Sequence, residues 1–429
     1  MPDSPLPAED AAKPEAGEGL EPPLTANAAA KKTVCLCNSA LAWGGGEKWH
    51  LDAALALAGR GWRVFLLCHP RGALYARAAE RSEGVRIVPL PLGRLSFLNP
   101  LCLRRLLRFF RNTRPGAVIL NLPADLKAAG PAARAAGVPR IIFRRGSALP
   151  VRNSACNRFL YGRVITRLIV NSEGTRRMVF RNNSRLLPSE RVSLLPNGLD
   201  PQAFDQALAR CDLALEAGTG AGPLADLARL SWTVRPLVLG TAGRLNRQKG
   251  QHLFLRLGRR LLDAGLDCRL VLAGSGEREA ELRAMAWELD LGEKVVFAGF
   301  QEDLSCFWRA IDLFVLTSLW EGFGFVLLEA MLAQKPILAY RVSNIPELVN
   351  NGVNGLLFPL PEGENAPDAH PPAAGGAIFP AKGDMAAGVL ELSRDVPRRR
   401  AMGRAGREFA LAGFSQSACM DRLEDLLTR

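Results

Sequence analysis

The chain has 429 residues, 48% of them hydrophobic and 23% charged, and this composition excludes a wholly disordered or fibrous protein. At about 150 residues per domain, the length predicts two or three domains. Residues 31–190 carry 28 Lys and Arg against 7 Asp and Glu, so the net charge of +13 is concentrated on one half of the chain, which predicts an anionic partner for that half.

Residues 1–30 are acidic and rich in Pro and Ala, and we expect them to form a disordered tail. They lack the basic start and apolar centre of a secretory signal, and no run of about 18 apolar residues follows, so we expect a cytoplasmic protein. The nine cysteines are odd in number and show no paired spacing, which argues against a disulfide framework, and we expect Cys35 and Cys37 to be buried, reduced thiols.

From Thr33 onward, short apolar runs alternate with amphipathic stretches, which predicts parallel strands joined by helices. A first domain, residues 31–198, has expected strands at 33–37, 63–68, 85–90, 117–120, 140–143 and 167–170. A linker, residues 199–235, shows no clear strand. A second domain, residues 236–412, has expected strands at 237–243, 268–274, 294–299, 313–317 and 336–340.

Residues 359–376 are rich in Pro, Gly and Ala, which favours a mobile surface insertion, and residues 413–429 are expected to form a C-terminal helix. The predicted fold class is α/β, with two Rossmann-like domains whose parallel sheets face each other across a cleft. In such sheets ligands bind beyond the carboxyl ends of the strands. The residues that follow the strands are therefore the candidates for a functional site.

Three consecutive glycines, residues 44–46, follow the first strand and precede a helix. Glycines let the backbone approach a ligand closely, and the N–H groups at a helix start favour an anion, although a flexible turn would show the same residues. The G-x-G-x-x-G spacing of dinucleotide-binding oxidoreductases is absent.

Two segments of the second domain carry charged side chains next to expected strands. In GTAGRLNRQKG, residues 240–250, Arg244 and Lys249 would suit a diphosphate, and we expect both to be surface groups. In LWEGFGFVLLEAML, residues 319–332, Glu321 precedes a glycine-rich turn and Glu329 lies inside the helix that follows. Carboxylates there could accept hydrogen bonds from ribose hydroxyls, although a lone helical glutamate is usually solvated.

Six segments, in chain order, resemble motifs of the family 4 glycosyltransferases of the GT-B type, the retaining group: GGGEKW, LIVNSEGTRRMV, SLLPNGLDPQAF, GRLNRQKG, LVLAGSGEREAEL and DLFVLTSLWEGFGFVLLEAML. The resemblance implies transfer of a sugar from a nucleotide-diphosphate sugar to a glycan or lipid-linked acceptor, with lipopolysaccharide synthesis as the expected setting. The alternatives are a GT-B sugar-nucleotide-binding protein without transferase activity and a sugar-nucleotide epimerase.

The resemblance also implies roles for individual residues. The implied catalytic residues are Glu321, facing the transferred sugar, and Arg244 and Lys249, gripping the donor diphosphate. Glu329 would bind the donor ribose. The other implied donor-binding residues are Gly45, Gly46, Gly322, Phe323 and Gly324. No cofactor and no metal are expected, since the chain has no D-x-D motif and the two cations would stabilise the leaving group instead.

Many members of the family place a histidine after the fifth N-terminal strand, near the donor sugar. This sequence has Arg144 and Arg145 there, and its four histidines lie elsewhere. Two alternatives stay open. Either these arginines bind an anionic acceptor or a donor phosphate, or the site works without that contact.

The basic half of the chain also bears on its partners. Nucleic acid is not expected, because there are only 3 Tyr and no helix-turn-helix pattern. Residues 99–116 predict a helix with Leu103, Leu106 and Phe110 on one face and arginines on another. This pattern fits a core-packed helix, but with so few acids nearby it favours peripheral binding to an anionic membrane surface, on the inner face.

Overall fold

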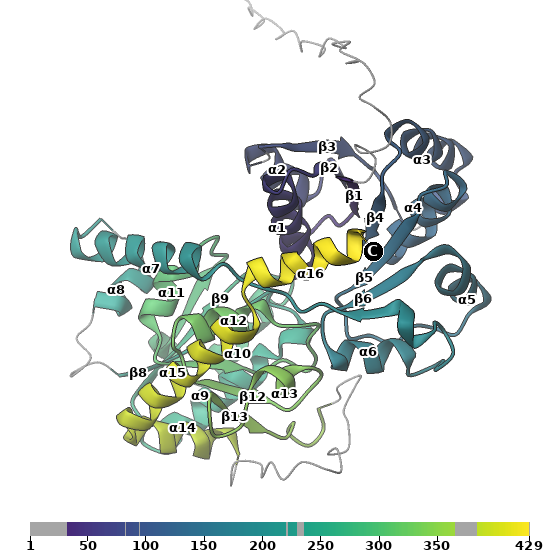
Figure 1. Ribbon diagram of the computed structural model, residues 1–429. Helices are drawn as coiled ribbons and strands as arrows, with labels where there is room; N and C mark the ends of the chain where they lie inside the picture. Colours follow the sequence, from purple (N-terminus) through teal and green to yellow (C-terminus); the bar gives the residue numbers. More distant parts are fainter. Residues whose placement is uncertain are drawn as a thin grey trace, which may run out of the picture.

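The computed structural model describes residues 32–428 except 82, 94, 220–221, 230–235 and 365–383. Within this part the chain forms two α/β domains, each built on one parallel sheet with helices on both sides (Figure 1). The predicted tail and residues 365–376 of the predicted insertion lie outside the described residues.

The N-terminal domain has a seven-stranded sheet in the order β3-β2-β1-β4-β5-β6-β7, with every neighbouring pair parallel. Its strands are β1 (Thr33–Asn38), β2 (Arg63–Cys68), β3 (Val85–Pro89), β4 (Ala117–Leu120), β5 (Arg140–Arg145), β6 (Arg167–Val170) and β7 (Val192–Leu194). Its helices are α1 (Gly45–Gly59), α2 (Ala73–Arg81), α3 (Pro100–Thr113), α4 (Pro123–Ala135), α5 (Ala155–Phe159) and α6 (Glu173–Phe180).

The C-terminal domain has a six-stranded parallel sheet in the order β10-β9-β8-β11-β12-β13. Its strands are β8 (Leu237–Ala242), β9 (Cys268–Ala273), β10 (Val295–Gly299), β11 (Leu313–Leu316), β12 (Ile337–Tyr340) and β13 (Gly355–Phe358). The helices are α7 (Pro201–Glu216), α8 (Pro223–Arg229), α9 (Gln251–Asp263), α10 (Glu279–Glu288), α11 (Ser305–Ala310), α12 (Phe325–Leu332), α13 (Ile345–Leu348), α14 (Met385–Arg394), α15 (Val396–Gly413) and α16 (Gln416–Thr428).

The predicted α/β fold class with two parallel sheets is confirmed, and all eleven predicted strands are present. Most of these strands are buried along nearly their whole length because helices cover both faces of each sheet. The strands β7 and β13 were not predicted; both are short and lie at sheet edges. The predicted linker contains two helices, α7 and α8.

The last helix, α16, returns to the N-terminal domain and lies beside α1 (Figure 1). Leu423 and Leu427 are fully buried in the same apolar cluster as Leu57 of α1. On the rim of this contact, the Trp62 Nε1–H donates to Glu424 Oε1 at 2.9 Å. The chain therefore crosses between the domains twice, and burial of this apolar face stabilises their association.

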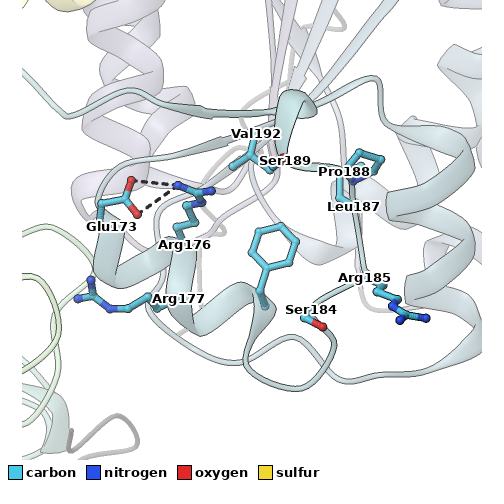
Figure 2. A pocket seen from close by; sticks show the side chains of 10 residues that line it. Glu173, Arg176, Arg177, Ser184, Arg185, Leu187, Pro188, Ser189 and Val192 are labelled. Carbon is cyan, nitrogen blue, oxygen red and sulfur yellow. Dashed lines mark hydrogen bonds and ion pairs between the residues drawn. The ribbon is translucent and has the colours of Figure 1, made fainter. Parts of the chain in front are cut away.

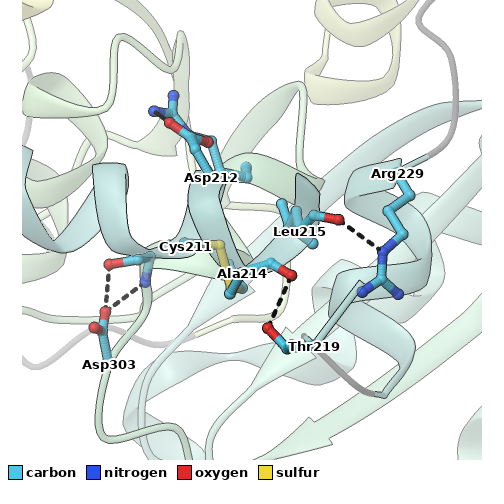
Figure 3. The surroundings of a disulfide bond; sticks show 10 residues. Cys211, Asp212, Ala214, Leu215, Thr219, Arg229 and Asp303 are labelled. Atoms are coloured by element: carbon cyan, nitrogen blue, oxygen red, sulfur yellow. Dashed lines mark hydrogen bonds and ion pairs between the residues drawn. A yellow bond between two sulfur atoms is a disulfide. The ribbon is translucent and has the colours of Figure 1, made fainter. Parts of the chain in front are cut away.

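The prediction that Cys35 and Cys37 are buried, reduced thiols is confirmed, but the expectation of no disulfide is wrong. Cys211 of α7 and Cys306 of α11 form a disulfide with a Cα–Cα distance of 5.7 Å (Figure 3), and Cys156 is exposed. The two bonded cysteines are 95 residues apart in the sequence. Their pairing follows from the packing of α7 on α11, which spacing along the chain does not reveal.

Candidate functional site

The location of the candidate site follows from the points at which the strand order of each sheet reverses. These points lie between β1 and β4 in the N-terminal sheet and between β8 and β11 in the C-terminal sheet. The loops that follow β1, β8 and β11 contain the three predicted site segments: the glycines 44–46, the cations of residues 244–249, and the turn 321–324. Open α/β sheets bind ligands at such points, so the topology supports the predicted location.

Lys249 and Glu321 form the central ion pair of the site. Lys249 Nζ lies 2.6 Å from Glu321 Oε1, which also accepts a 2.6 Å hydrogen bond from the Ser318 hydroxyl. The backbone N–H of Glu321 donates to Ser343 Oγ at 3.0 Å. Glu321 is only 4% exposed and the Lys249 side chain 17%. The expectation that Lys249 is a free surface group is therefore wrong, because its ammonium is held on a buried carboxylate.

Close packing of two loops explains this pair. Gly250, with φ +61°, follows Lys249, and a Cβ on Gly250 would lie 2.2 Å from the carbonyl oxygen of Thr317. Only glycine permits this approach, which sets the loop after β8 directly on the loop after β11. Arg244, on the same loop, is exposed, and its side chain forms no ion pair with any described residue. The predicted surface position of Arg244 is confirmed.

The glycine-rich turn before α12 presents its backbone to the N-terminal domain. Thr175 Oγ1 donates to the Gly322 carbonyl at 3.2 Å, and a Cβ on Gly322 would lie 2.0 Å from the carbonyl oxygen of Gly146. Gly324 has φ +86° and starts α12. Within the described part of the chain, the N–H groups of residues 322–324 donate no hydrogen bond. Free amides at a helix start suit an anion or a polar sugar, whereas the Phe323 side chain is buried.

Glu329, one turn inside α12, is a partly buried carboxylate. Burial raises the pKa of Glu329 to about 7, while the positive charge of nearby Lys48 acts in the opposite direction. Lys48 lies in the first turn of α1 and pairs with Asp52 at 3.0 Å. The sequence analysis missed Lys48, although it stands two residues after the three glycines.

The glycines of the first loop allow close contacts on both sides. A Cβ on Gly45 would lie 3.0 Å from the ring of Phe325, which belongs to the other domain, and one on Gly46 would lie 3.1 Å from the Asn121 side chain after β4. The structure therefore brings the glycine loop against the start of α12. Any residue with a Cβ at position 45 or 46 would require these neighbouring side chains to move.

Arg144 does not lie where an acceptor-binding role would require it. It is 1% exposed, its guanidinium stacks on the Trp49 ring at 4.2 Å, and its Nη2 donates to Asn197 Oδ1 at 2.7 Å. Burial, together with the positive charge of Arg144, lowers the pKa of His50 to about 3. Arg144 is thus an interior cation under α1. Arg145 is half-buried and donates to the Leu149 carbonyl at 2.9 Å.

Comparison with known proteins agrees with this geometry. Residues 43–203 match the family described as Glycosyltransferase Family 4, and residues 227–369 match the Glycosyl transferases group 1. The chain belongs to the group 1 and family 4 glycosyltransferases. One match falls on the N-terminal domain and the other on the C-terminal domain. The family membership is therefore supported by both domains that contribute loops to the candidate site.

Curated glycosyltransferases similar to the chain match it over part of their length. A lipopolysaccharide core biosynthesis glycosyltransferase of Rhizobium meliloti is 27% identical over 49% of this chain and 55% of its own length. D-inositol 3-phosphate glycosyltransferase 1 of Catenulispora acidiphila is 31% identical over 54% of this chain and 50% of its own. The chain thus spans about half the length of these relatives.

Solved GT-B glycosyltransferase structures share the whole described fold. The Anabaena protein HepE in complex with UDP and glucose has a TM-score of 0.72 at 20% identity, over 92% of this chain and 99% of that chain. The lipopolysaccharide biosynthesis glycosyltransferase WaaG has a TM-score of 0.61 at 14% identity, over 92% and 99% of the two chains. These similarities confirm the predicted GT-B arrangement of two Rossmann-like domains.

One carboxylate beside the site binds the two domains to each other. Glu347 of α13 accepts hydrogen bonds from the backbone N–H groups of Glu173 and Gly174, at 2.9 and 2.6 Å, at the start of α6 in the other domain. It also lies 3.7 Å from Arg177. A carboxylate at a helix N-terminus is stabilised by the free amides and by the helix dipole.

We expect Glu347→Ala to loosen this contact and to populate an open arrangement of the domains. Hydrogen bonds to a charged acceptor contribute about 1.5–3 kcal/mol each, enough to shift such an equilibrium by tenfold or more. Small-angle X-ray scattering should show a larger radius of gyration than for the wild type. Glu288→Ala, an exposed glutamate of the same domain, is the control. An unchanged scattering curve for Glu347→Ala would show that the other contacts, among them α16 and the Thr175–Gly322 hydrogen bond, are enough to hold the domains together.

Proposed function

We propose that the protein is a retaining glycosyltransferase that moves a sugar from a nucleotide-diphosphate sugar to a glycan or lipid-linked acceptor in cell-envelope synthesis. The observation that carries this proposal is the Lys249–Glu321 pair, fixed between the strands at which the C-terminal sheet reverses its order. The family membership, the lipopolysaccharide relatives and the UDP-glucose complex of the similar Anabaena protein support it.

The proposed chemistry needs stabilisation of a departing diphosphate. When the bond between the anomeric carbon and the phosphate oxygen breaks, its electron pair goes to the diphosphate. The acceptor hydroxyl oxygen forms the new bond to the anomeric carbon, and its proton passes to the departing diphosphate. Arg244 and Lys249 are the cations placed to stabilise that charge, and the free amides of residues 322–324 and Glu321 would face the sugar. Gly45 and Gly46 would approach the diphosphate from the other domain, and Arg145 is the remaining candidate for an anionic acceptor group.

A panel of nucleotide sugars tests the proposal. A thermal-shift screen should show one nucleotide sugar that raises the melting temperature, because a ligand that binds only the folded state stabilises it. Incubation of that donor with glycan and lipid-linked acceptors should release the nucleoside diphosphate only when an acceptor is present. Binding without release would favour a non-catalytic sugar-nucleotide-binding protein, and conversion of the sugar without an acceptor would favour an epimerase.

We further propose that the N-terminal domain docks on an anionic membrane surface through α3 and the turn before it. Leu95, Leu98 and Leu101 are 69%, 66% and 69% exposed. The expected helix is confirmed as α3, with Leu106 and Phe110 buried. Its exposed arginines are Arg104, Arg105, Arg108 and Arg111. Exposed leucines beside a row of cations fit the boundary between acyl chains and anionic headgroups. No described helix is long and apolar enough to cross a membrane.

We expect the Leu98→Ser, Leu101→Ser double variant to lose at least tenfold in partition to vesicles. Insertion of one leucine into the membrane contributes roughly 1.5–3 kcal/mol to the free energy of binding to the vesicle, and each nearby cation contributes about 1 kcal/mol. Co-sedimentation with phosphatidylglycerol vesicles at low and high salt, against phosphatidylcholine vesicles, measures both contributions. Leu213→Ser on α7, where the leucine is 65% exposed, is the matched control. Recovery of the wild type in the supernatant under all conditions would refute membrane docking.

A further inference from the structure

A pocket of about 590 Å³ opens on the N-terminal domain between α6 and the segment that leads into β7 (Figure 2). The residues that line it are Glu173, Arg176, Arg177, Phe180, Ser184, Arg185, Leu187, Pro188, Ser189 and Val192. None of them belongs to the three loops of the candidate site. A volume in this range is typical of sites for small molecules.

The rim of this pocket, which we call the α6 pocket, is cationic. Arg176 and Arg177 project from α6, and Arg185 lies across the pocket from them (Figure 2). Glu173 is the one carboxylate among the lining residues, and its oxygens lie 3.4 and 3.5 Å from Arg176 Nη1. Arg185 forms no ion pair with any residue that the structure describes. Three guanidinium groups against one carboxylate leave the α6 pocket with an excess of positive charge.

The helix start itself is not available to a ligand. The N–H groups of Glu173 and Gly174 are occupied by Glu347 of the other domain, and Arg177 also faces that carboxylate at 3.7 Å. Recognition of an anion in the α6 pocket must therefore come from the side chains of Arg176 and Arg185. Arginine forks bind phosphate oxygens through two parallel hydrogen bonds, which a single positive charge does not reproduce.

The rest of the α6 pocket wall is apolar. Leu187 is 3% exposed, and Phe180 and Val192 are partly buried and pack against the apolar core of the domain. Pro188 completes this side of the pocket. An apolar wall beside an arginine rim fits a ligand with an anionic group joined to a short hydrocarbon portion. The wall contributes to the free energy of binding only when it buries apolar ligand surface away from water.

We propose that the α6 pocket binds a phosphate monoester whose alcohol portion is apolar, with Arg176 and Arg185 on the phosphate and Phe180 and Leu187 against the hydrocarbon. This site is separate from the proposed donor site, and binding here does not require the proposed transferase activity. The same chemistry is found in a free phosphate ester and in a lipid that ends in a phosphate, and the two sources need separate measurements.

Calorimetry with butyl phosphate, inorganic phosphate and butanol tests the proposal on the full-length protein. We expect butyl phosphate to bind at least tenfold more tightly than inorganic phosphate, since each fully buried methylene strengthens binding roughly fourfold. Butanol should not bind measurably. The Arg176→Gln, Arg185→Gln double variant should weaken butyl phosphate binding at least tenfold. Both arginines are solvent-accessible, so the variant should keep the wild-type melting temperature.

The Arg400→Gln, Arg404→Gln double variant, which removes two exposed arginines of α15, is the matched control. Arg244 and Lys249 are unchanged in the wild type, the α6 pocket variant and the control variant. Any binding of phosphate at these two residues therefore does not contribute to the difference in affinity between the three proteins. Equal butyl phosphate affinity in the wild type and the α6 pocket variant would overturn the proposal, as would equal affinity for butyl phosphate and inorganic phosphate.

Vesicles that contain phosphatidic acid, compared with vesicles of phosphatidylglycerol at equal charge, identify the source of the ligand. A preference for phosphatidic acid that the α6 pocket variant loses and the α15 variant keeps would assign a lipid phosphate to the pocket. Tight butyl phosphate binding without such a preference would assign a free phosphate ester. Both results support the phosphate monoester site, and neither depends on whether the protein transfers sugar.

Discussion

Lys249→Ala is expected to lower turnover by about 10²–10³-fold, because loss of one preorganised group that stabilises developing charge has an effect of this size. Under the proposed function, that group faces the diphosphate as it departs. The measurement is kcat/KM with the nucleotide sugar that the donor panel identifies. Lys294→Ala is the matched control, since Lys294 forms a comparable 2.7 Å pair with Asp267 on the surface of the same domain. Wild-type turnover in Lys249→Ala would refute the diphosphate assignment.

The same substitution is also expected to lower stability, which separates its structural effect from its catalytic effect. Removal of Lys249 leaves the 4% exposed Glu321 carboxylate with only Ser318 as a side-chain donor. Loss of one partner from a buried pair lowers the free energy of unfolding by about 3–5 kcal/mol. The Lys249→Ala, Glu321→Gln double variant should recover most of the melting temperature and none of the turnover. Recovery of both would show that Lys249 acts only by neutralising Glu321.

Arg244 provides the complementary case. Its side chain is exposed and forms no ion pair with the described residues, so Arg244→Ala should leave the melting temperature unchanged while lowering turnover. The contrast between Arg244 and Lys249 arises from their neighbours. The sequence placed both on one loop, but it did not show that Gly250 brings Lys249 against the loop after β11.

The sequence predicted the fold well because periodic apolar runs determine which segments become buried strands. The runs at β1 and β11 are buried along their whole length. Within each parallel sheet, the loops that follow the strands lie at the same end of that sheet whatever the details of packing. The apolar runs therefore predict that the cation loop and the turn at Glu321 lie at the same end of the C-terminal sheet. The glycine loop follows a strand of the other sheet, and its place opposite them was implied by the family resemblance.

What the sequence did not reveal depends on contacts between distant segments. The Cys211–Cys306 disulfide joins two helices whose packing no local pattern encodes. The bonds of Glu347 to α6 likewise cross from one domain to the other. Arg144 follows an apolar strand, which suggested a side chain at the ligand, but Trp49 and Asn197 draw it into the interior. In each case the partner residue, and not the residue itself, decides the role.

The pH dependence of donor binding is expected to follow Glu329. Burial raises the pKa of this carboxyl to about 7, so it is mostly protonated at pH 6 and mostly ionised at pH 8. The ionised form is the stronger acceptor for ribose hydroxyls. Affinity for the nucleotide sugar should therefore rise about tenfold from pH 6 to pH 8, in step with the ionised fraction. Glu329→Gln should bind the donor more weakly at pH 8 and show a flat profile.

The effect of pH on stability has the opposite sign. Since the folded-state pKa of Glu329 lies above its ordinary value of 4.5, the native state holds this proton more tightly than the unfolded chain. This contribution to stability is fully present below pH 4.5 and is lost as pH rises through about 7. The melting temperature of Glu329→Gln, relative to the wild type, should therefore be higher at pH 8 than at pH 5. Glu288→Gln, which replaces an exposed glutamate, is the control and should show no such change.

Two results would contradict these expectations for Glu329. If the donor affinity of the wild type does not vary between pH 6 and pH 8, Glu329 does not belong to the ribose site. If the difference in melting temperature between Glu329→Gln and the wild type is the same at pH 5 and pH 8, the Glu329 carboxyl is ionised at neutral pH and held by Lys48.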